Sequence, residues 1–251
     1  MQCLQDEHCR YMIADEVGLG KTIEACSVLK IHLSSNANQR VLIAVPGALE
    51  AQWRTELLFK FGLINGDNGN GNTIFLETVE RLNESKINED WDFLIVDEVH
   101  NYLKDSGNYE KIHSLSKNSD NVILLSATPI QQREEEYLSL LRLILPQKYD
   151  ELSANEFSDL VEKQNRISRL TYSLLDEIDS FKNELLPEIE ADNPHEDEDV
   201  LEELKVIQEN LEDLADVIGD SKLNEMISKV EYSSDDFGLY NIQVIISYIC
   251  D

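Results

Sequence analysis

The chain has 251 residues, of which 42% are hydrophobic, so it can bury one large core together with a smaller appendage. It contains no apolar run of about eighteen residues, the length that spans a bilayer, and no signal-peptide pattern, so we expect no membrane contact and a cytoplasmic location. The formal net charge of −29 is unfavourable for binding nucleic acid, and its distribution along the sequence therefore matters.

The acidic residues are concentrated in the second part of the sequence. Residues 1–149 carry 14 Lys and Arg against 22 Asp and Glu, a net charge of −8, whereas residues 150–251 carry 7 against 28, a net charge of −21. The hydrophobic pattern changes near the same place, at Pro146. We therefore expect two domains, 1–149 and 150–251.

Up to Pro146, short runs rich in β-branched residues alternate with amphipathic segments. The runs lie at 11–14, 41–45, 73–76, 92–96 and 121–127. Runs that are apolar on both faces and alternate with helices favour an α/β fold, a parallel sheet with helices on both faces. A mixed sheet is the alternative. The segment 65–72, NGDNGNGN, has no residue suited to a core and is expected to form a mobile surface loop.

The first of these runs leads through a glycine-bearing loop into a helix, which is the context of a phosphate-binding loop. The loop sequence ADEVGLGKTIE ends in GKT, but Asp15 stands where the pattern G-x-x-x-x-G-K-[ST] has its first glycine. Gly18 and Gly20 would let backbone N–H groups and the positive end of the helix approach phosphate oxygens. Lys21 would reach the β- and γ-phosphates, and the Thr22 hydroxyl would bind Mg²⁺.

A second polar cluster follows a later predicted strand, in DFLIVDEVH. Ligands bind at the carboxyl ends of strands in sheets of this kind. Asp97 would hold the metal, directly or through water, and Glu98 would orient and deprotonate the attacking water. A solvated turn is the alternative reading of two adjacent acids.

The segment AQWRTEL lies between these two clusters. Trp53 and Arg54 allow a stacking and phosphate-contacting pair. Helical spacing instead favours Trp53 packing against Leu49 and Leu57, with Arg54 on the surface.

After Pro146 the pattern becomes helical, with apolar positions at alternating spacings of four and three. Two stripes result: Leu160, Gln164, Ile167, Thr171, Leu174, Ile178, Phe181 and Leu185, then Val200, Leu204, Ile207, Leu211, Leu214 and Ile218. The intervening PEIEADNPHEDED ends the first helix and gives the chain room to reverse. We therefore expect an antiparallel α-helical hairpin, in which Gln164 and Thr171 set the register or face a partner.

Several segments, taken in order, resemble motifs I, Ia, II and III of the Swi/Snf-type ATPases of helicase superfamily two. They are ADEVGLGKTIEA, VLIAVPGALEAQWRTEL, LIVDEVHNY and LLSATPIQQREEEYLSLLRLILP. The form DEVGLGKT is especially similar to the bacterial branch that includes the RNA-polymerase-recycling ATPases. The resemblance covers roughly residues 10–150 and implies the first RecA-like lobe of such a protein.

The resemblance implies ATP and Mg²⁺ as cofactors, and it assigns roles to individual residues. The nucleotide loop would comprise Asp15, Glu16, Gly18, Leu19, Gly20, Lys21 and Thr22. Catalysis would use Lys21, Asp97 and Glu98, with Thr22 and Asp97 on the metal. His100 of the DEAH-like box, with Ser126 and Thr128 of the S-A-T motif, would couple the nucleotide state to the grip on nucleic acid. Pro46 falls on the motif that contacts the DNA backbone.

The function implied is ATP hydrolysis coupled to movement along double-stranded DNA. The alternatives are an RNA helicase of the same superfamily and a non-catalytic interaction module that acts through the acidic helices. Because phosphate would repel residues 150–251, we expect no DNA grip there. They would form a solvated arm, a guide for a basic protein partner, or a cover over the DNA path.

Members of this family have a second RecA-like lobe that brings an arginine finger, and no such region follows LLSATPI. Gln2 lies too close to Ala14 to serve as the adenine-reading glutamine. We therefore expect a first lobe with its helical insertion, from a longer protein or a truncated gene product. Because an arginine finger can be worth ~10³–10⁵-fold in turnover, this lobe alone would bind MgATP weakly and hydrolyse little of it.

Overall fold

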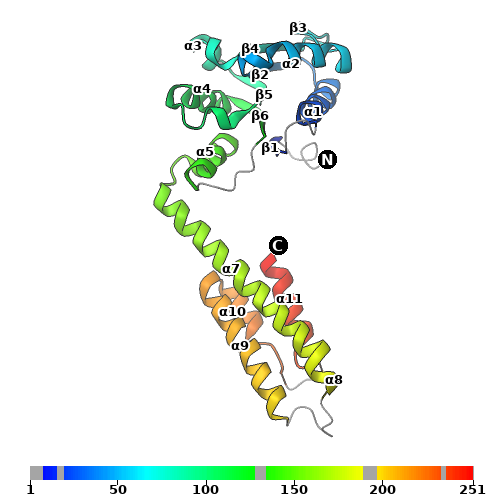
Figure 1. Ribbon diagram of the computed structural model, residues 1–251, viewed down its shortest axis with the longest axis vertical. Helices are drawn as coiled ribbons and strands as arrows, with labels where there is room; N and C mark the ends of the chain where they lie inside the picture. Colours follow the sequence, from blue (N-terminus) through cyan, green and yellow to red (C-terminus); the bar gives the residue numbers. More distant parts are fainter. Residues whose placement is uncertain (1–7, 16–19, 128–133, 189–196, 233–235, 251) are drawn as a thin grey trace. The chain divides into compact units, whose positions relative to one another are not determined.

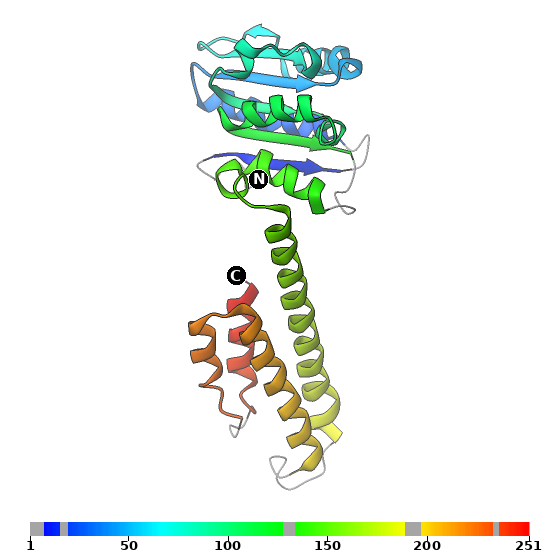
Figure 2. The same cartoon turned by 90° about the vertical axis from the view of Figure 1, so that its left-hand side faces the viewer.

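The computed structural model describes residues 8–15, 20–127, 134–188, 197–232 and 236–250 (Figures 1 and 2). The chain divides into two compact units, Met1–Phe157 and Ser158–Asp251, here called the sheet unit and the helical unit. The division falls inside a long helix, shortly after the change in charge at residue 149. No helix within the described ranges combines the length and apolarity needed to cross a membrane.

The sheet unit is built on six strands in the order β1-β6-β5-β2-β4-β3. The strands are β1 Arg10–Ala14, β2 Arg40–Val45, β3 Gly66–Asp67, β4 Thr73–Thr78, β5 Trp91–Val96 and β6 Ser119–Ser126. Neighbouring strands pair in parallel, except that β3 pairs antiparallel with β4. The predicted α/β fold is confirmed, with a short antiparallel strand at one edge of a mostly parallel sheet.

Helices cover both faces of the sheet (Figure 1). They are α1 Lys21–Ser35, α2 Glu50–Glu56, α3 Glu84–Ile87, α4 Ser106–Lys117, α5 Glu134–Ile144 and α6 Pro146–Tyr149. Alternate residues of β2 enter different cores, because successive side chains of a strand point to opposite faces. Val41 and Ile43 pack in the cluster with α1 and α2, whereas Leu42 and Ala44 pack in the cluster with α4 and α5.

The segment 65–72 contains one buried residue, Asn72. Asn72 is only 3% exposed, and its amide donates to the carbonyl oxygens of Leu33 and Asn36, at 3.1 and 3.2 Å. Its side-chain oxygen accepts from the backbone N–H of Gln39 at 2.9 Å. The predicted surface position is confirmed, since most of the segment is exposed, whereas its mobility stays a prediction. Asn72 is the exception, because its side-chain amide makes the contacts that an apolar residue would otherwise make.

The helical unit contains the predicted hairpin and a further pair of helices. Its helices are α7 Ala154–Ser180, which begins in the sheet unit, then a π-helical turn Phe181–Leu185, α8 Leu186–Glu188, α9 Glu198–Ile218, α10 Ser221–Ile227 and α11 Leu239–Cys250. Asn210 of α9 donates to Glu177 of α7 at 2.6 Å, and Lys163 donates to the carbonyl oxygen of Ile218 at 3.3 Å. These contacts run in opposite directions along the two helices and confirm the antiparallel hairpin.

The hairpin alone does not account for the core of this unit. Leu223 of α10 and Ile242 and Ile245 of α11 are buried in the same cluster as the two predicted stripes. The first stripe also begins later than predicted, since Leu160 is 51% exposed and Gln164 is exposed. The predicted two-helix extension is therefore too small.

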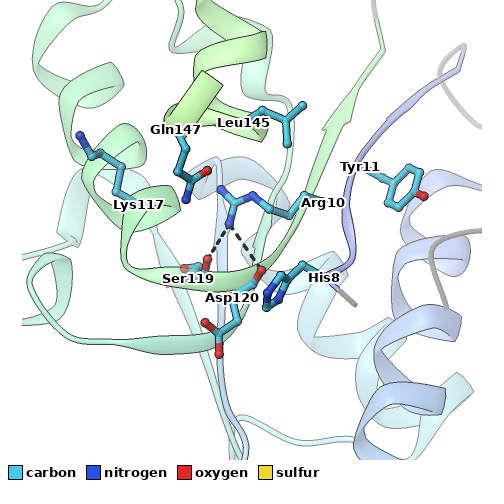
Figure 3. A pocket seen from close by; sticks show the side chains of 8 residues that line it. All are labelled: His8, Arg10, Tyr11, Lys117, Ser119, Asp120, Leu145 and Gln147. Carbon is cyan, nitrogen blue, oxygen red and sulfur yellow. Dashed lines mark hydrogen bonds between the residues drawn. The ribbon is translucent and has the colours of Figure 1, made fainter. Parts of the chain in front are cut away.

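Arg10 joins β1 to the neighbouring helices at the amino-terminal edge of the sheet, where a cavity of about 580 Å³ opens (Figure 3). Its guanidinium donates to the carbonyl oxygens of Ile144 and Ser119, both at 2.5 Å, and to the Ser116 hydroxyl at 2.7 Å. Burial lowers the pKa of Arg10, and the charge of Asp120 raises it. Each guanidinium nitrogen is already engaged by the protein, so Arg10 acts as a structural clamp.

We predict that Arg10→Met lowers the free energy of unfolding of the sheet unit by about 3 kcal/mol, because charge-assisted bonds are lost and buried carbonyl oxygens lose their donor. Trp53 and Trp91 are both buried in this unit, so urea unfolding followed by tryptophan fluorescence measures it. Arg54→Met is the control, because Arg54 makes an exposed ion pair with Glu50 and should cost less than about 1 kcal/mol. Equal losses in the two variants would contradict the clamp.

Candidate nucleotide site

The loop after β1 presents Lys21 at the start of α1. Gly20 caps this helix with φ 96°, a left-handed conformation that glycine adopts at little cost. Lys21 is 8% exposed, and its ammonium donates to the carbonyl oxygen of Asp15 at 2.6 Å. The predicted site residues Glu16, Gly18 and Leu19 lie outside the described residues.

Asp97 lies directly after β5 and is 5% exposed. One carboxylate oxygen accepts the Nε1–H of Trp53 at 2.6 Å, and the other accepts the backbone N–H of Glu98 at 2.8 Å. The pKa of Asp97 is raised, chiefly by burial and also by the charge of Glu98, and the two hydrogen bonds and the charge of Lys21 offset only part of this rise. The carboxylate therefore has a fixed orientation and lies close to the lysine of the loop.

Trp53 does more than the sequence predicts. It packs in the core cluster with Leu57 and against Leu49, as expected, and Arg54 is on the surface, paired with Glu50 at 2.9 Å. The hydrogen bond from its indole to Asp97 was not predicted. A signal for it existed, since a buried tryptophan usually places its N–H on an acceptor.

Glu98 has a left-handed backbone, with φ 49°, at the start of the turn Val99–Asn101. Residues other than glycine rarely adopt this backbone conformation, and those that do are concentrated at functional sites. Its Oε2 is buried and makes no hydrogen bond with a described residue, although Nδ1 of His100 lies 3.3 Å away. The same nitrogen lies 3.2 Å from the Ser126 hydroxyl. The structure thus brings together Glu98, His100 and Ser126, whereas Thr128 lies outside the described residues.

Lys21, Asp97 and Glu98 converge on a cavity of about 340 Å³ at the carboxyl-terminal edge of the sheet, whereas His100 and Ser126 do not line it. It is lined by Gly20, Lys21, Thr22, Ile23, Leu49, Gln52, Glu56, Lys60, Asp97 and Glu98. Pro46 follows β2 at the same edge but does not line the cavity. Sequence reasoning did not single out Gln52, Glu56 and Lys60, which α2 and the π-helical turn Leu57–Phe61 bring to the cavity.

The donors at this cavity fit a magnesium ion. The Thr22 hydroxyl and the Asp97 carboxylate offer oxygen ligands, which Mg²⁺ prefers. In the described part of the chain, no three His, Cys, Asp or Glu side chains come together to enclose an ion. Mg²⁺ usually takes much of its coordination shell from water and substrate phosphates.

The thiol of Cys26, next to the cavity residues, is not a reactive group. Burial, followed by the charge of Glu56, raises the pKa of Cys26 to about 12. Because of this raised pKa, the thiol is protonated and unreactive at neutral pH. Cys26 lies on α1 one turn after Thr22. Glu56, Lys60 and Asp97, whose charges also affect the pKa of this thiol, line the cavity together with residues 20–23 at the start of α1.

The sequence is similar to those of two families and of several known proteins. The family model described as SNF2-related domain matches residues 71–230, and that of the type III restriction enzyme res subunit matches residues 1–131. RNA polymerase-associated protein RapA of Vibrio atlanticus is 32% identical over 170 residues, which cover 58% of this chain and 18% of that protein. RapA of Proteus mirabilis is 31% identical over 200 residues, which cover 70% of this chain and 20% of that protein. The chain thus spans about a fifth of the length of these relatives.

The fold is similar to that of a solved protein, the SWI2/SNF2 ATPase core of Sulfolobus solfataricus in complex with dsDNA. The TM-score is 0.51 at 16% identity, over 80% of this chain and 53% of the other. This likeness supports a RecA-like helicase-core fold for the chain. Because the SNF2-related model matches well over half of the sequence, the chain belongs to the SNF2-related domain family.

Proposed function

We propose that the sheet unit is the ATP-binding lobe of an ATP-dependent translocase on double-stranded DNA. The observation that carries the proposal is the convergence of Lys21, Thr22, Asp97 and Glu98 on one cavity at the carboxyl-terminal edge of the sheet. Membership of the SNF2-related family supports it, as does the DNA complex of the solved relative.

Each of these side chains has a part in phosphoryl transfer. Lys21, at the start of α1, would neutralise the β- and γ-phosphates, together with the positive end of the helix. Thr22 and Asp97 would hold Mg²⁺, which when bound neutralises charge on the phosphate oxygens. Glu98 would orient and deprotonate the attacking water through the carboxylate oxygen that makes no hydrogen bond with a described residue. Trp53 would keep Asp97 in place for this step.

His100 provides a route from the nucleotide to the nucleic acid. Its Nδ1 lies between Glu98, after β5, and Ser126, at the end of β6. A change at the γ-phosphate would alter these contacts, and we propose that Ser126 passes the change on to the segment containing Thr128. The DNA backbone would lie near Pro46, and the helical unit would instead meet a basic protein surface in the cytoplasm.

We predict that Lys21→Ala weakens the binding of a fluorescent ATP analogue in the presence of Mg²⁺ by roughly 10–100-fold, the value of a charge-assisted hydrogen bond. Lys30→Ala is the matched control, because Lys30 is an exposed lysine on the same helix. Fluorescence anisotropy measures both affinities. Equal affinities in the two variants would place the nucleotide elsewhere.

We predict that Trp53→Phe reduces the gain in analogue affinity that Mg²⁺ provides by about 10-fold, since groups that orient a metal ligand are typically worth 10–100-fold in metal affinity. Trp91→Phe is the matched control. Trp91 is also buried, but its indole donates to the carbonyl oxygen of Lys86 at 3.0 Å, away from the cavity. A loss of the Mg²⁺ effect in both variants would mean that packing, rather than the bond to Asp97, is responsible.

We predict that ATP hydrolysis by the chain is slow, rises more with duplex DNA than with RNA, and disappears in Glu98→Gln. Single-turnover assays with radiolabelled ATP give the sensitivity needed. Stimulation by RNA alone would favour an RNA helicase. Turnover that survives in Glu98→Gln would contradict the role of this residue.

A further inference from the structure

Glu56 lines the nucleotide cavity but has no role in the proposed phosphoryl transfer. It follows Trp53 by one turn of α2, and it lines the cavity together with Thr22 and Asp97. The helix that holds Asp97 through the indole of Trp53 therefore also delivers a second carboxylate to the metal side of the site.

The two oxygens of Glu56 are in different situations. Oε1 accepts a hydrogen bond from the side-chain amide of Gln52 at 3.1 Å. Oε2 is buried and makes no hydrogen bond within the described residues, and Nζ of Lys60 lies 3.7 Å from it. The side chain as a whole is 16% exposed. Nζ of Lys60 is too far from Oε2 to donate a hydrogen bond, although it still forms an ion pair with Glu56. Because a buried carboxylate oxygen without a hydrogen bond is costly, this oxygen can accept one from a bound ligand.

Glu50, on the same helix, shows the contrast. One of its oxygens lies 2.9 Å from Arg54, and the other lies 3.4 Å from Arg81, on the outer side of the helix. Both of its oxygens are therefore satisfied by the protein. Each oxygen of Glu50 accepts a hydrogen bond from an arginine, whereas the buried oxygen of Glu56 has only the longer ion pair with Lys60.

The charges in the cavity indicate what the missing donor is. Three carboxylates, Glu56, Asp97 and Glu98, line the cavity with two ammonium groups, Lys21 and Lys60. A nucleotide adds further negative charge, so a carboxylate at this place is unfavourable unless a cation lies between it and the phosphates. Direct coordination by several acids does not fit, because no group of three converges on one point among the described residues.

We propose that Glu56 is a positioning residue that accepts a hydrogen bond, at Oε2, from a water molecule in the coordination shell of the bound Mg²⁺. Magnesium usually keeps several waters in proteins, and carboxylates that bind such waters fix the orientation of the shell. Gln52 holds the carboxylate in the required rotamer through Oε1. The inference rests on the proposed function, since it assumes that the metal is held at Thr22 and Asp97.

The test uses Mn²⁺ as a paramagnetic substitute and the 251-residue chain with a non-hydrolysable ATP analogue. The electron paramagnetic resonance signal of free Mn²⁺ gives the metal affinity. Glu56→Gln is expected to weaken Mn²⁺ binding by about 10-fold. It should not weaken binding of the analogue in the absence of metal, because it removes a negative charge that faces the phosphates. Glu50→Gln, the matched control, is expected to bind Mn²⁺ as the wild type does.

Asp97→Asn separates the failure of this inference from the failure of the proposed function. If Asp97→Asn weakens Mn²⁺ binding and Glu56→Gln does not, the inference is wrong and the nucleotide site stands. If neither variant weakens it, both are wrong. Should Glu56→Gln unfold, Glu56→Asp replaces it, because this change keeps the charge and withdraws the oxygens by one methylene. Metal affinity equal to that of the wild type in Glu56→Asp would then overturn the inference.

Discussion

The buried carboxylate of Asp97 is the constraint on which the site depends. Removing such a charge from water is costly, and it is tolerated here because the indole of Trp53 and the backbone N–H of Glu98 both donate to it. Trp53 is itself 1% exposed, within the apolar cluster between the sheet and α1. The position of the acid is therefore set by the packing of the core, which also fixes the start of α1 and hence Lys21.

The two edges of the sheet have different tasks. At the carboxyl-terminal edge, residues that follow β1 and β5 line a cavity, and Oε2 of Glu98 makes no hydrogen bond with a residue that the structure describes. At the opposite edge, Arg10 donates hydrogen bonds to the carbonyl oxygens at the ends of α4 and α5 and at the start of β6. Strong hydrogen bonding at one edge fixes the strands, so that the other edge can keep unsatisfied groups for a ligand.

The sequence predicts what local patterns determine. Strands buried on both faces leave long β-branched runs such as that of β2, and the GKT and DEVH segments identify Lys21, Thr22, Asp97 and Glu98 by their spacing. Contacts between distant residues leave no such pattern. The bond from Trp53 to Asp97, the burial of Asn72 and the clamp at Arg10 each join segments that are far apart in the sequence.

In the helical unit, too, only part of the core could be predicted from the sequence. The stripe in α9 has regular heptad spacing and was predicted correctly. The buried residues of α11 also lie at helical spacing, but exposed apolar residues such as Tyr240 and Val244 obscure this stripe in the sequence. Its place in the core could not be predicted from spacing, although Ile242 and Ile245 are buried there. The size of this core therefore emerged only from the tertiary structure.

The left-handed backbone of Glu98 has a consequence for how this position can evolve. A side chain in that conformation costs roughly 1 kcal/mol or more compared with glycine, which would adopt it freely. Selection for stability alone would therefore favour glycine here, and only selection for chemistry would retain the glutamate. Among descendants that have lost the activity, this is a position at which the sequence would drift early, while Arg10 and Trp53 would still be kept by the fold.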